Sequence, residues 1–109
     1  MQVAYDEELE ARVAAEIVGW GTTRKKMFGG TAHLLHGNLM CGVYKDYLVL
    51  RLGEQAGADA LKKPRVRPFD ITGKPLKGWV MVEKQGIGGA KLLPWLTKAR
   101  KFASTLPPK

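Results

Sequence analysis

Residues 24–52, RKKMFGGTAHLLHGNLMCGVYKDYLVLRL, decide the fold of this chain. From Arg24 onward the apolar side chains follow the two-residue period of a β-strand rather than the period of a helix. Gly37-Asn38 predicts a two-residue hairpin turn, and Lys45-Asp46 predicts a second turn. Gly29-Gly30 predicts a bend or bulge that joins two strands. The stretch is therefore predicted to form consecutive antiparallel strands.

The two turns determine which side chains share a face of this sheet, because directly opposed residues lie on the same face. Leu34 is expected opposite Cys41, and Tyr44 opposite Tyr47. The predicted core face is almost entirely aliphatic and holds Leu34, Leu39, Cys41, Val43, Leu48, Leu50 and Leu52. The predicted second face is mixed in character and holds His33, Leu35, Met40, Tyr44, Tyr47, Val49 and Arg51.

Helices are predicted before and after these strands in the sequence. An apolar residue recurs every four positions from Tyr5 to Ile17, which predicts an amphipathic helix over about residues 5–18. The acidic residues of this helix are interpreted as support for its N-terminal end. A short helix is predicted within residues 53–63, a strand around residues 79–83, and a final helix that begins at Leu92 or Leu93.

The predicted order is helix, three strands, helix, one or two strands, helix. That order is typical of a two-layer α+β fold in which helices pack on one face of an antiparallel sheet. We expect one domain over residues 1–109. Within it, residues 1–22 form the N-terminal helix and its connection, and residues 105–109 form a frayed tail.

The charge of the chain is unevenly distributed. The net charge is +8, yet residues 1–16 contain five acidic residues and one basic residue. The excess of positive charge indicates either an anionic partner such as nucleic acid or a solvated basic surface. The candidate contacts to nucleic acid or another anion are Arg24, Lys25, Lys26, Lys62, Lys63, Arg65 and Arg67.

Residue types that carry catalysis or bind metal are scarce. Cys41 is the single cysteine and falls among leucines, where a thiol behaves as a small apolar group. His33 and His36 are predicted on opposite faces of a strand, so they cannot bind one metal ion together. The glycine-rich segments at 26–30 and 85–91 match no nucleotide-binding motif. We expect no cofactor, no metal and no enzymatic activity, unless a pocket brings one histidine beside a charged group.

The N-terminal region argues against export and membrane insertion. It is acidic and amphipathic, whereas a signal peptide begins with basic residues and continues with an apolar segment. No apolar run approaches the roughly 20 residues of a membrane span. We expect a cytoplasmic protein without a membrane partner.

Several motifs together resemble the N-terminal domain of the TfoX/Sxy regulators of bacterial competence. They are RKKMFGG, a glycine-containing hairpin, YLVLRL, RPF and a terminal helix with a central tryptophan. The hairpin departs from the family pattern, because Gly37-Asn38 is followed by Leu39, Met40 and Cys41. The most specific piece is KMFGG, formed by Lys26, Met27, Phe28, Gly29 and Gly30.

The resemblance implies a two-layer α+β domain of the secretion-chaperone-like kind. It also implies a structural role for KMFGG, with Phe28 in the core and Gly29-Gly30 bending the sheet. Full-length regulators carry a second, C-terminal domain, and this chain is expected to hold the first alone. The longer members are associated with turning on DNA-uptake genes alongside a DNA-bound activator.

The sequence leaves two functions open. The leading hypothesis is an interaction module, a transcriptional co-regulator that binds another protein or a second copy of itself. Its candidate contact face is Leu35, Met40, Tyr44, Tyr47, Val49 and Arg51, unless a helix or loop of the same chain covers it. The alternative is a nucleic-acid-binding protein of weak sequence specificity that uses its basic surface.

Overall fold

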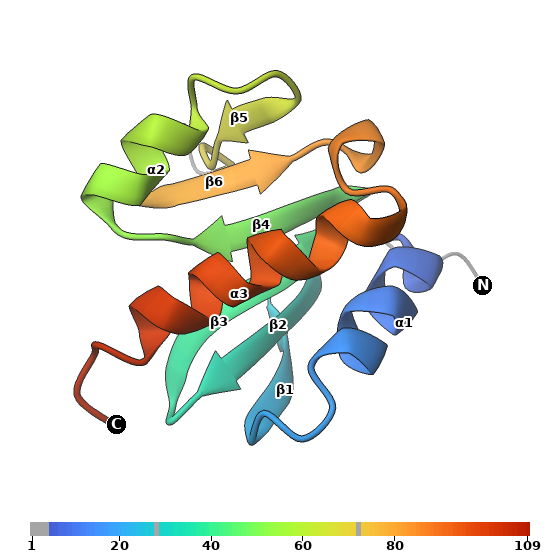
Figure 1. Ribbon diagram of the computed structural model, residues 1–109, viewed down its shortest axis with the longest axis vertical. Helices are drawn as coiled ribbons and strands as arrows, with labels where there is room; N and C mark the ends of the chain where they lie inside the picture. Colours follow the sequence, from blue (N-terminus) through green and yellow to red (C-terminus); the bar gives the residue numbers. More distant parts are fainter. Residues whose placement is uncertain (1–4, 28, 72) are drawn as a thin grey trace.

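The computed structural model describes residues 5–27, 29–71 and 73–109, which form one six-stranded antiparallel sheet and three α-helices (Figure 1). The fold is α+β, as predicted. Two short 3-10 helices, Lys84–Gly86 and Gly89–Lys91, precede the last α-helix. The other elements are α1 (Glu7–Glu16), β1 (Thr22–Met27), β2 (Gly30–Leu35), β3 (Asn38–Tyr44), β4 (Tyr47–Arg51), α2 (Glu54–Ala60), β5 (Val66–Pro68), β6 (Trp79–Val82) and α3 (Leu92–Ala103).

The strand order in the sheet is β1-β2-β3-β4-β6-β5. Four strands precede α2, one more than the expected order contains, because the turn at Gly29 separates β1 from β2. Strands β1 and β5 are the two edges of the sheet, at opposite ends of the molecule in Figure 1.

The hairpin between β2 and β3 differs from the prediction by one residue. Its turn is His36-Gly37, with φ angles of 52° and 82°, so Leu35 pairs with Asn38. A turn with positive φ at both central residues favours glycine at the second of them, and Gly37 occupies that position. The prediction of Gly37-Asn38 was therefore wrong. The second turn, Lys45-Asp46, is confirmed by the pairing of Tyr44 with Tyr47.

This one-residue slip exchanges the faces of the leucines in β2, because neighbouring residues of a strand point to opposite faces. Leu35 is buried in the main core, whereas Leu34 is half-buried on the other face. Met40 also enters the main core. It has no cross-strand partner in β2, because the register shifts between His33 and Leu34. Leu39 lies with Leu34, so both of these core-face assignments were wrong.

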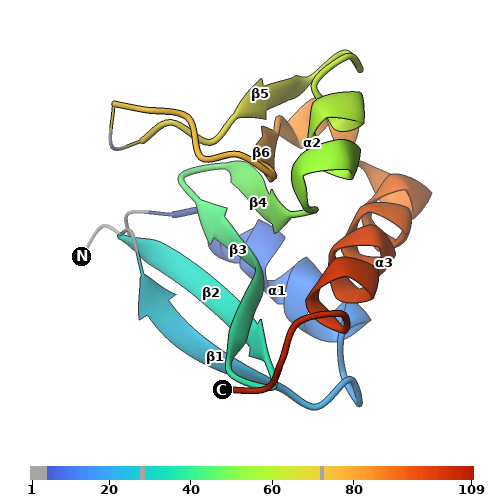
Figure 2. The same cartoon turned by 90° about the vertical axis from the view of Figure 1, so that its left-hand side faces the viewer.

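The main core forms between the sheet and the helices. The prediction is confirmed for Cys41, Val43, Leu48, Leu50 and Leu52, which are all buried in this core. The helices lie on the side of the sheet opposite the connection from β5 to β6 (Figure 2). Their core residues are Leu9 and Val13 in α1, Ala60 in α2, and Leu92, Leu96, Ala99 and Ala103 in α3.

The C-terminal tail lies against the β2–β3 hairpin. The side-chain amide of Asn38 donates a hydrogen bond of 2.8 Å to the carbonyl oxygen of Pro107. The backbone amide of Lys109 donates to the carbonyl oxygen of His36, also at 2.8 Å. These bonds hold residues 105–109, which the sequence predicted to be frayed, to the hairpin.

No helix in the described residues has both the length and the apolar character that a transmembrane span requires.

Candidate functional site

The predicted contact face is divided between the interior and the surface. Leu35 and Met40 belong to the main core, so the sequence-based assignment of these two residues to an exposed face was wrong. The slipped hairpin and the unpaired position of Met40 are the cause. Val49 is fully buried, whereas Tyr44 and Tyr47 are half-buried.

A loop of the same chain covers the centre of this face. Phe69, which follows β5, packs with Val49 and Met81 in a second apolar cluster. Phe69 also stacks on Trp79, with 5.6 Å between the ring centroids. The connection from β5 to β6 therefore occupies much of the surface that the sequence assigns to a partner.

Arginine side chains that lie over aromatic rings border this face. Arg67 donates a hydrogen bond of 2.9 Å to the hydroxyl of Tyr47 and stacks over its ring. Arg51 lies between Trp79 and Phe102, at 5.5 and 5.6 Å from the two ring centroids. These contacts hold Arg51, a predicted contact-face residue, and Arg67, a predicted nucleic-acid contact, against neighbours of the same chain.

The seven predicted nucleic-acid contacts form two groups at opposite edges of the sheet. The first group lies on β1, and the second lies in and around the connection from α2 to β5. Several of these cations already have acidic partners: Arg24 pairs with Glu10, Lys62 with Asp59, and Arg65 with Glu83. The first group is Arg24, Lys25 and Lys26, and the second is Lys62, Lys63, Arg65 and Arg67.

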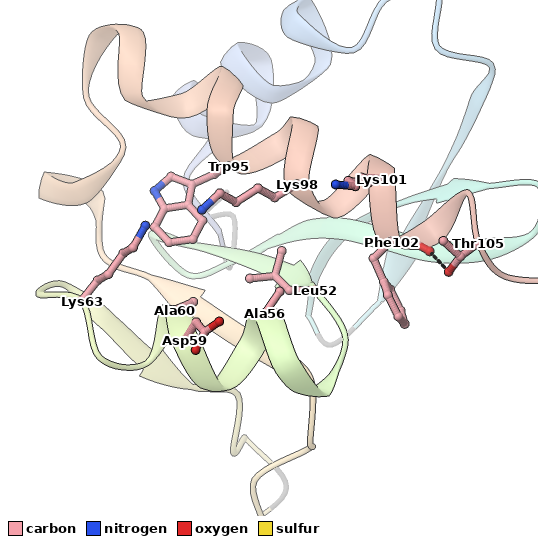
Figure 3. Close-up of a pocket in the computed structure, with 10 residues that line it drawn as sticks. All are labelled: Leu52, Ala56, Asp59, Ala60, Lys63, Trp95, Lys98, Lys101, Phe102 and Thr105. Atoms are coloured by element: carbon pink, nitrogen blue, oxygen red, sulfur yellow. Dashed lines mark hydrogen bonds between the residues drawn. The ribbon is translucent and has the colours of Figure 1, made fainter.

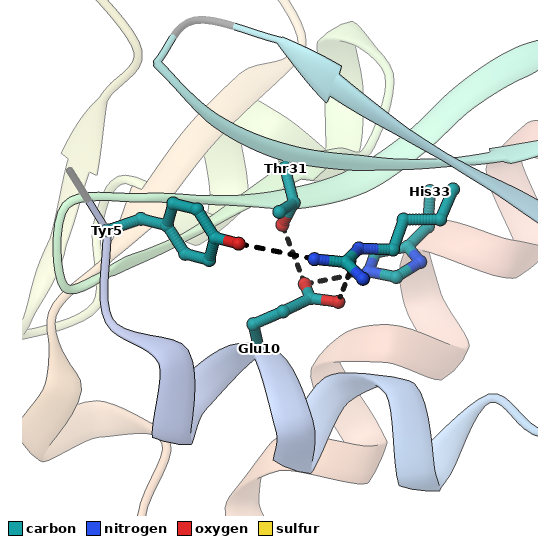
Figure 4. A network of polar contacts seen from close by, with 5 residues as sticks. Tyr5, Glu10, Thr31 and His33 are labelled. Carbon is teal, nitrogen blue, oxygen red and sulfur yellow. Dashed lines mark hydrogen bonds and ion pairs between the residues drawn. The ribbon is translucent and has the colours of Figure 1, made fainter. Parts of the chain in front are cut away.

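A buried carboxylate links α1 to the first two strands. Oε1 of Glu10 accepts a hydrogen bond of 2.6 Å from Thr31 Oγ1 and lies at a hydrogen-bonding distance of 2.9 Å from His33 Nε2 (Figure 4). Its other oxygen, Oε2, lies 3.2 Å from Nε of Arg24. Burial alone would raise the pKa of Glu10, but the hydrogen bonds from His33 and Thr31 and the nearby positive charges lower it.

Sequence reasoning missed this cluster. It assigned every acid of the first helix to helix support and found no partner for His33, which is buried against Glu10. The spacing of Glu10 in the sequence could have revealed the cluster. Glu10 lies three residues before Val13 and seven before Ile17, so it is on the face of the helix that points to the core. Among the residues that the structure describes, the contacts of the carboxylate with Thr31, His33 and Arg24 are internal to the domain, so the cluster is a structural link between α1 and the sheet.

Cys41 is fully buried, as predicted. Burial raises the pKa of its thiol, and the charge of Glu10 adds to that shift. No group of three or more His, Cys, Asp and Glu side chains in residues 5–27, 29–71 and 73–109 could hold a metal ion.

We expect iodoacetamide to label Cys41 at least about 100-fold more slowly in the native chain than in denaturant, because labelling requires local opening. The measurement is the mass increase with time. An Ala58→Cys variant supplies an exposed cysteine as the control. Equal labelling rates at the two cysteines in the native state would contradict the burial.

A groove lies between α2 and α3 (Figure 3). It has a volume of about 400 Å³. It forms because α2 packs chiefly on β6, whereas α3 packs on β3 and β4. Its floor is apolar, and lysines stand around it. The lining residues are Leu52, Ala56, Asp59, Ala60, Lys63, Trp95, Lys98, Lys101, Phe102 and Thr105.

Trp95 and Phe102 are apolar residues of α3 that share the helix with Leu92, Leu96 and Ala99. Both are only half-buried, because they border the groove, while Leu92, Leu96 and Ala99 enter the core. No local pattern distinguishes a stripe that faces a groove from one that faces a core, so this surface could not be found from the sequence.

A family model, the TfoX N-terminal domain, matches residues 19–103. The chain belongs to the TfoX N-terminal domain family. The match spans all six strands, α2 and α3, and it leaves out α1. No curated protein and no solved structure matches the chain.

The family motif KMFGG lies at the junction of β1 and β2. Lys26 and Met27 end β1, and Phe28 lies outside the described residues. Gly29 has a φ of 75° in the turn, and Gly30 begins β2, buried against β3. In this TfoX N-terminal domain, the two glycines occupy the bend that the sequence predicts.

Proposed function

We propose that this chain is a non-enzymatic protein-interaction domain that acts in transcriptional control, as the resemblance to competence regulators implies. The observation that carries the proposal is the groove between α2 and α3, where apolar side chains remain open to solvent beside lysines. Open apolar surface in a folded domain is typical of a site that meets another molecule. Membership of the TfoX N-terminal domain family supports the link to competence regulation.

Nucleic-acid binding is the alternative function. The basic residues that would carry it lie on β1 and beside β5, at the two edges of the sheet. Phosphate contacts from one duplex are favoured by a continuous basic surface, which this arrangement does not provide. The geometry therefore supports protein contacts better than phosphate contacts.

Two measurements test the proposed function. In the first, fluorescence anisotropy follows the purified chain with labelled duplex DNA and with RNA from about 50 to 200 mM salt. We expect no saturable binding. An affinity that falls by about tenfold or more over this range would favour the nucleic-acid alternative.

In the second, transcripts of the DNA-uptake genes are measured in cells with and without the chain. We expect them to fall when the chain is deleted and to return when it is supplied again. Unchanged transcripts would contradict the regulatory role, whatever the chain binds.

A further inference from the structure

The groove between α2 and α3 combines an apolar floor with a border of lysines. Lys63, Lys98 and Lys101 border it, and Asp59 is the one acidic residue in its lining. The carboxylate of Asp59 already pairs with Lys62. Among the described residues, no carboxylate lies within ion-pair distance of the three rim lysines.

Two of these lysines converge on one aromatic ring. The Nζ atoms of Lys63 and Lys98 each lie 5.3 Å from the centroid of the Trp95 ring. Lys98 reaches the ring from α3, and Lys63 reaches it from the connection that follows α2 (Figure 3). The contact with Lys63 and its positive charge lower the pKa of Lys98. Two neighbouring ammonium groups favour an anion that contacts both of them.

The floor beside this pair suits an apolar side chain. Leu52 and Ala60 are almost completely buried beneath it, and the ring of Phe102 borders its other end. Ala56 and Ala60 lie four residues apart on one face of α2, and their small side chains leave space in the groove. An occupant therefore needs an apolar group and a negative charge close together.

We propose that this groove is the docking site for an acidic, amphipathic segment of a partner protein. An apolar side chain of that segment lies on Leu52, Ala56 and Ala60, and a carboxylate lies between Lys63 and Lys98. The proposal rests on the protein-interaction function above and names the partner chemistry of that function. The segment combines the apolar surface of a helix-in-groove complex with charge complementarity to the rim.

The acidic helix of a second copy does not meet this requirement. Leu9 and Val13 of α1, and Ile17 directly after it, are already buried in the core of their own domain. The exposed face of α1 carries acidic residues but offers none of its buried apolar side chains to the groove. We therefore assign the segment to another protein, and self-association of the chain through the groove would overturn that assignment.

The first test uses a labelled synthetic peptide in which leucine and glutamate recur at helical spacing, and its matched version with glutamine for every glutamate. We expect saturable anisotropy with the acidic peptide at a Kd below about 1 mM, and binding at least about tenfold weaker for the glutamine version. Equal affinity of the two peptides, or no binding of the acidic one, would overturn the assignment.

Matched variants test the location. K63E/K98E reverses the rim charge, and K25E/K26E makes the same net change on β1 at the edge of the sheet. Ala56→Leu fills the groove, and Ala58→Leu adds the same side chain to an exposed position of α2 outside it. We expect K63E/K98E and Ala56→Leu to weaken peptide binding by about tenfold or more, and both controls to stay within about twofold.

An equal loss of peptide affinity in K63E/K98E and K25E/K26E would indicate that the peptide responds only to the net charge of the chain, and it would overturn the docking site. Displacement of the peptide by an RNA or DNA oligonucleotide would assign the groove to nucleic acid instead. Thermal unfolding of each variant identifies any that fails to fold, and Ala56→Leu and K63E/K98E perturb different properties of the groove.

The transcript measurement separates the two proposals. If transcripts depend on the chain but remain normal in Ala56→Leu and K63E/K98E, the regulatory function stands and the groove assignment fails. If they do not depend on the chain at all, the proposed function fails, while the peptide measurement still reports on the groove.

Discussion

Replacing Gly30 with alanine is expected to lower the free energy of unfolding by about 3 kcal/mol or more. Gly30 begins β2 and is buried against β3. A Cβ atom at this position would overlap the backbone carbonyl oxygen of Val43. Because this neighbour is backbone, no rotation of a side chain relieves the overlap, and β2 must move away from β3.

Urea denaturation measures the change, with two other glycines as controls. An added Cβ at Gly88 meets nothing within 4 Å, and its φ of −71° suits alanine, so we expect a change of less than about 0.5 kcal/mol. Gly29 is equally open but has a φ of 75°, so Gly29→Ala should cost about 1–2 kcal/mol. A Gly30→Ala chain as stable as Gly88→Ala would refute the close approach of β2 and β3.

Replacing Glu10 with alanine is expected to lower the free energy of unfolding by about 3 kcal/mol. The carboxylate is the shared partner of Thr31 and His33, which are both buried. Its loss leaves buried polar groups without that partner and removes the link from α1 to β1 and β2. The cost comes chiefly from these orphaned groups, because the exposed Arg24 can turn to solvent.

Glu16→Ala, on the same helix but exposed, serves as the control and should change stability by less than about 0.5 kcal/mol. Glu10→Gln keeps the size of the side chain and one acceptor oxygen but loses the charge. We expect it to fall between the wild type and Glu10→Ala. Urea denaturation measures the free energy of unfolding of each variant. A loss of stability in Glu16→Ala equal to that in Glu10→Ala would refute the buried link.

The contribution of Glu10 also has a defined pH dependence. Its pKa in the folded state lies below the ordinary value of 4.5, so the folded state holds the charged form more strongly than the unfolded state does. The stabilisation is fully present above the unfolded pKa and is lost as the pH falls through the folded pKa. The difference in stability between the wild type and Glu10→Ala should therefore shrink as the pH falls through the folded pKa of Glu10.

The sequence by itself determined the class of the fold and most of its elements. Alternating apolar residues predicted the strands, and four-residue spacing predicted α1, because each pattern is the direct result of local backbone geometry. The turn at Lys45-Asp46 fixed the register of β3 and β4 and so placed Val43, Leu48 and Leu50 in the core.

The tertiary structure alone decided the details that depend on one residue or on distant segments. Moving the hairpin turn from Gly37-Asn38 to His36-Gly37 leaves the alternation unchanged, yet it exchanges the faces of Leu34 and Leu35. The contacts of Glu10 with β2, and of Lys63 with Trp95, join residues from elements that are distant in the sequence. Only packing brings them together, because no local pattern encodes the distance between two segments that meet in the folded state.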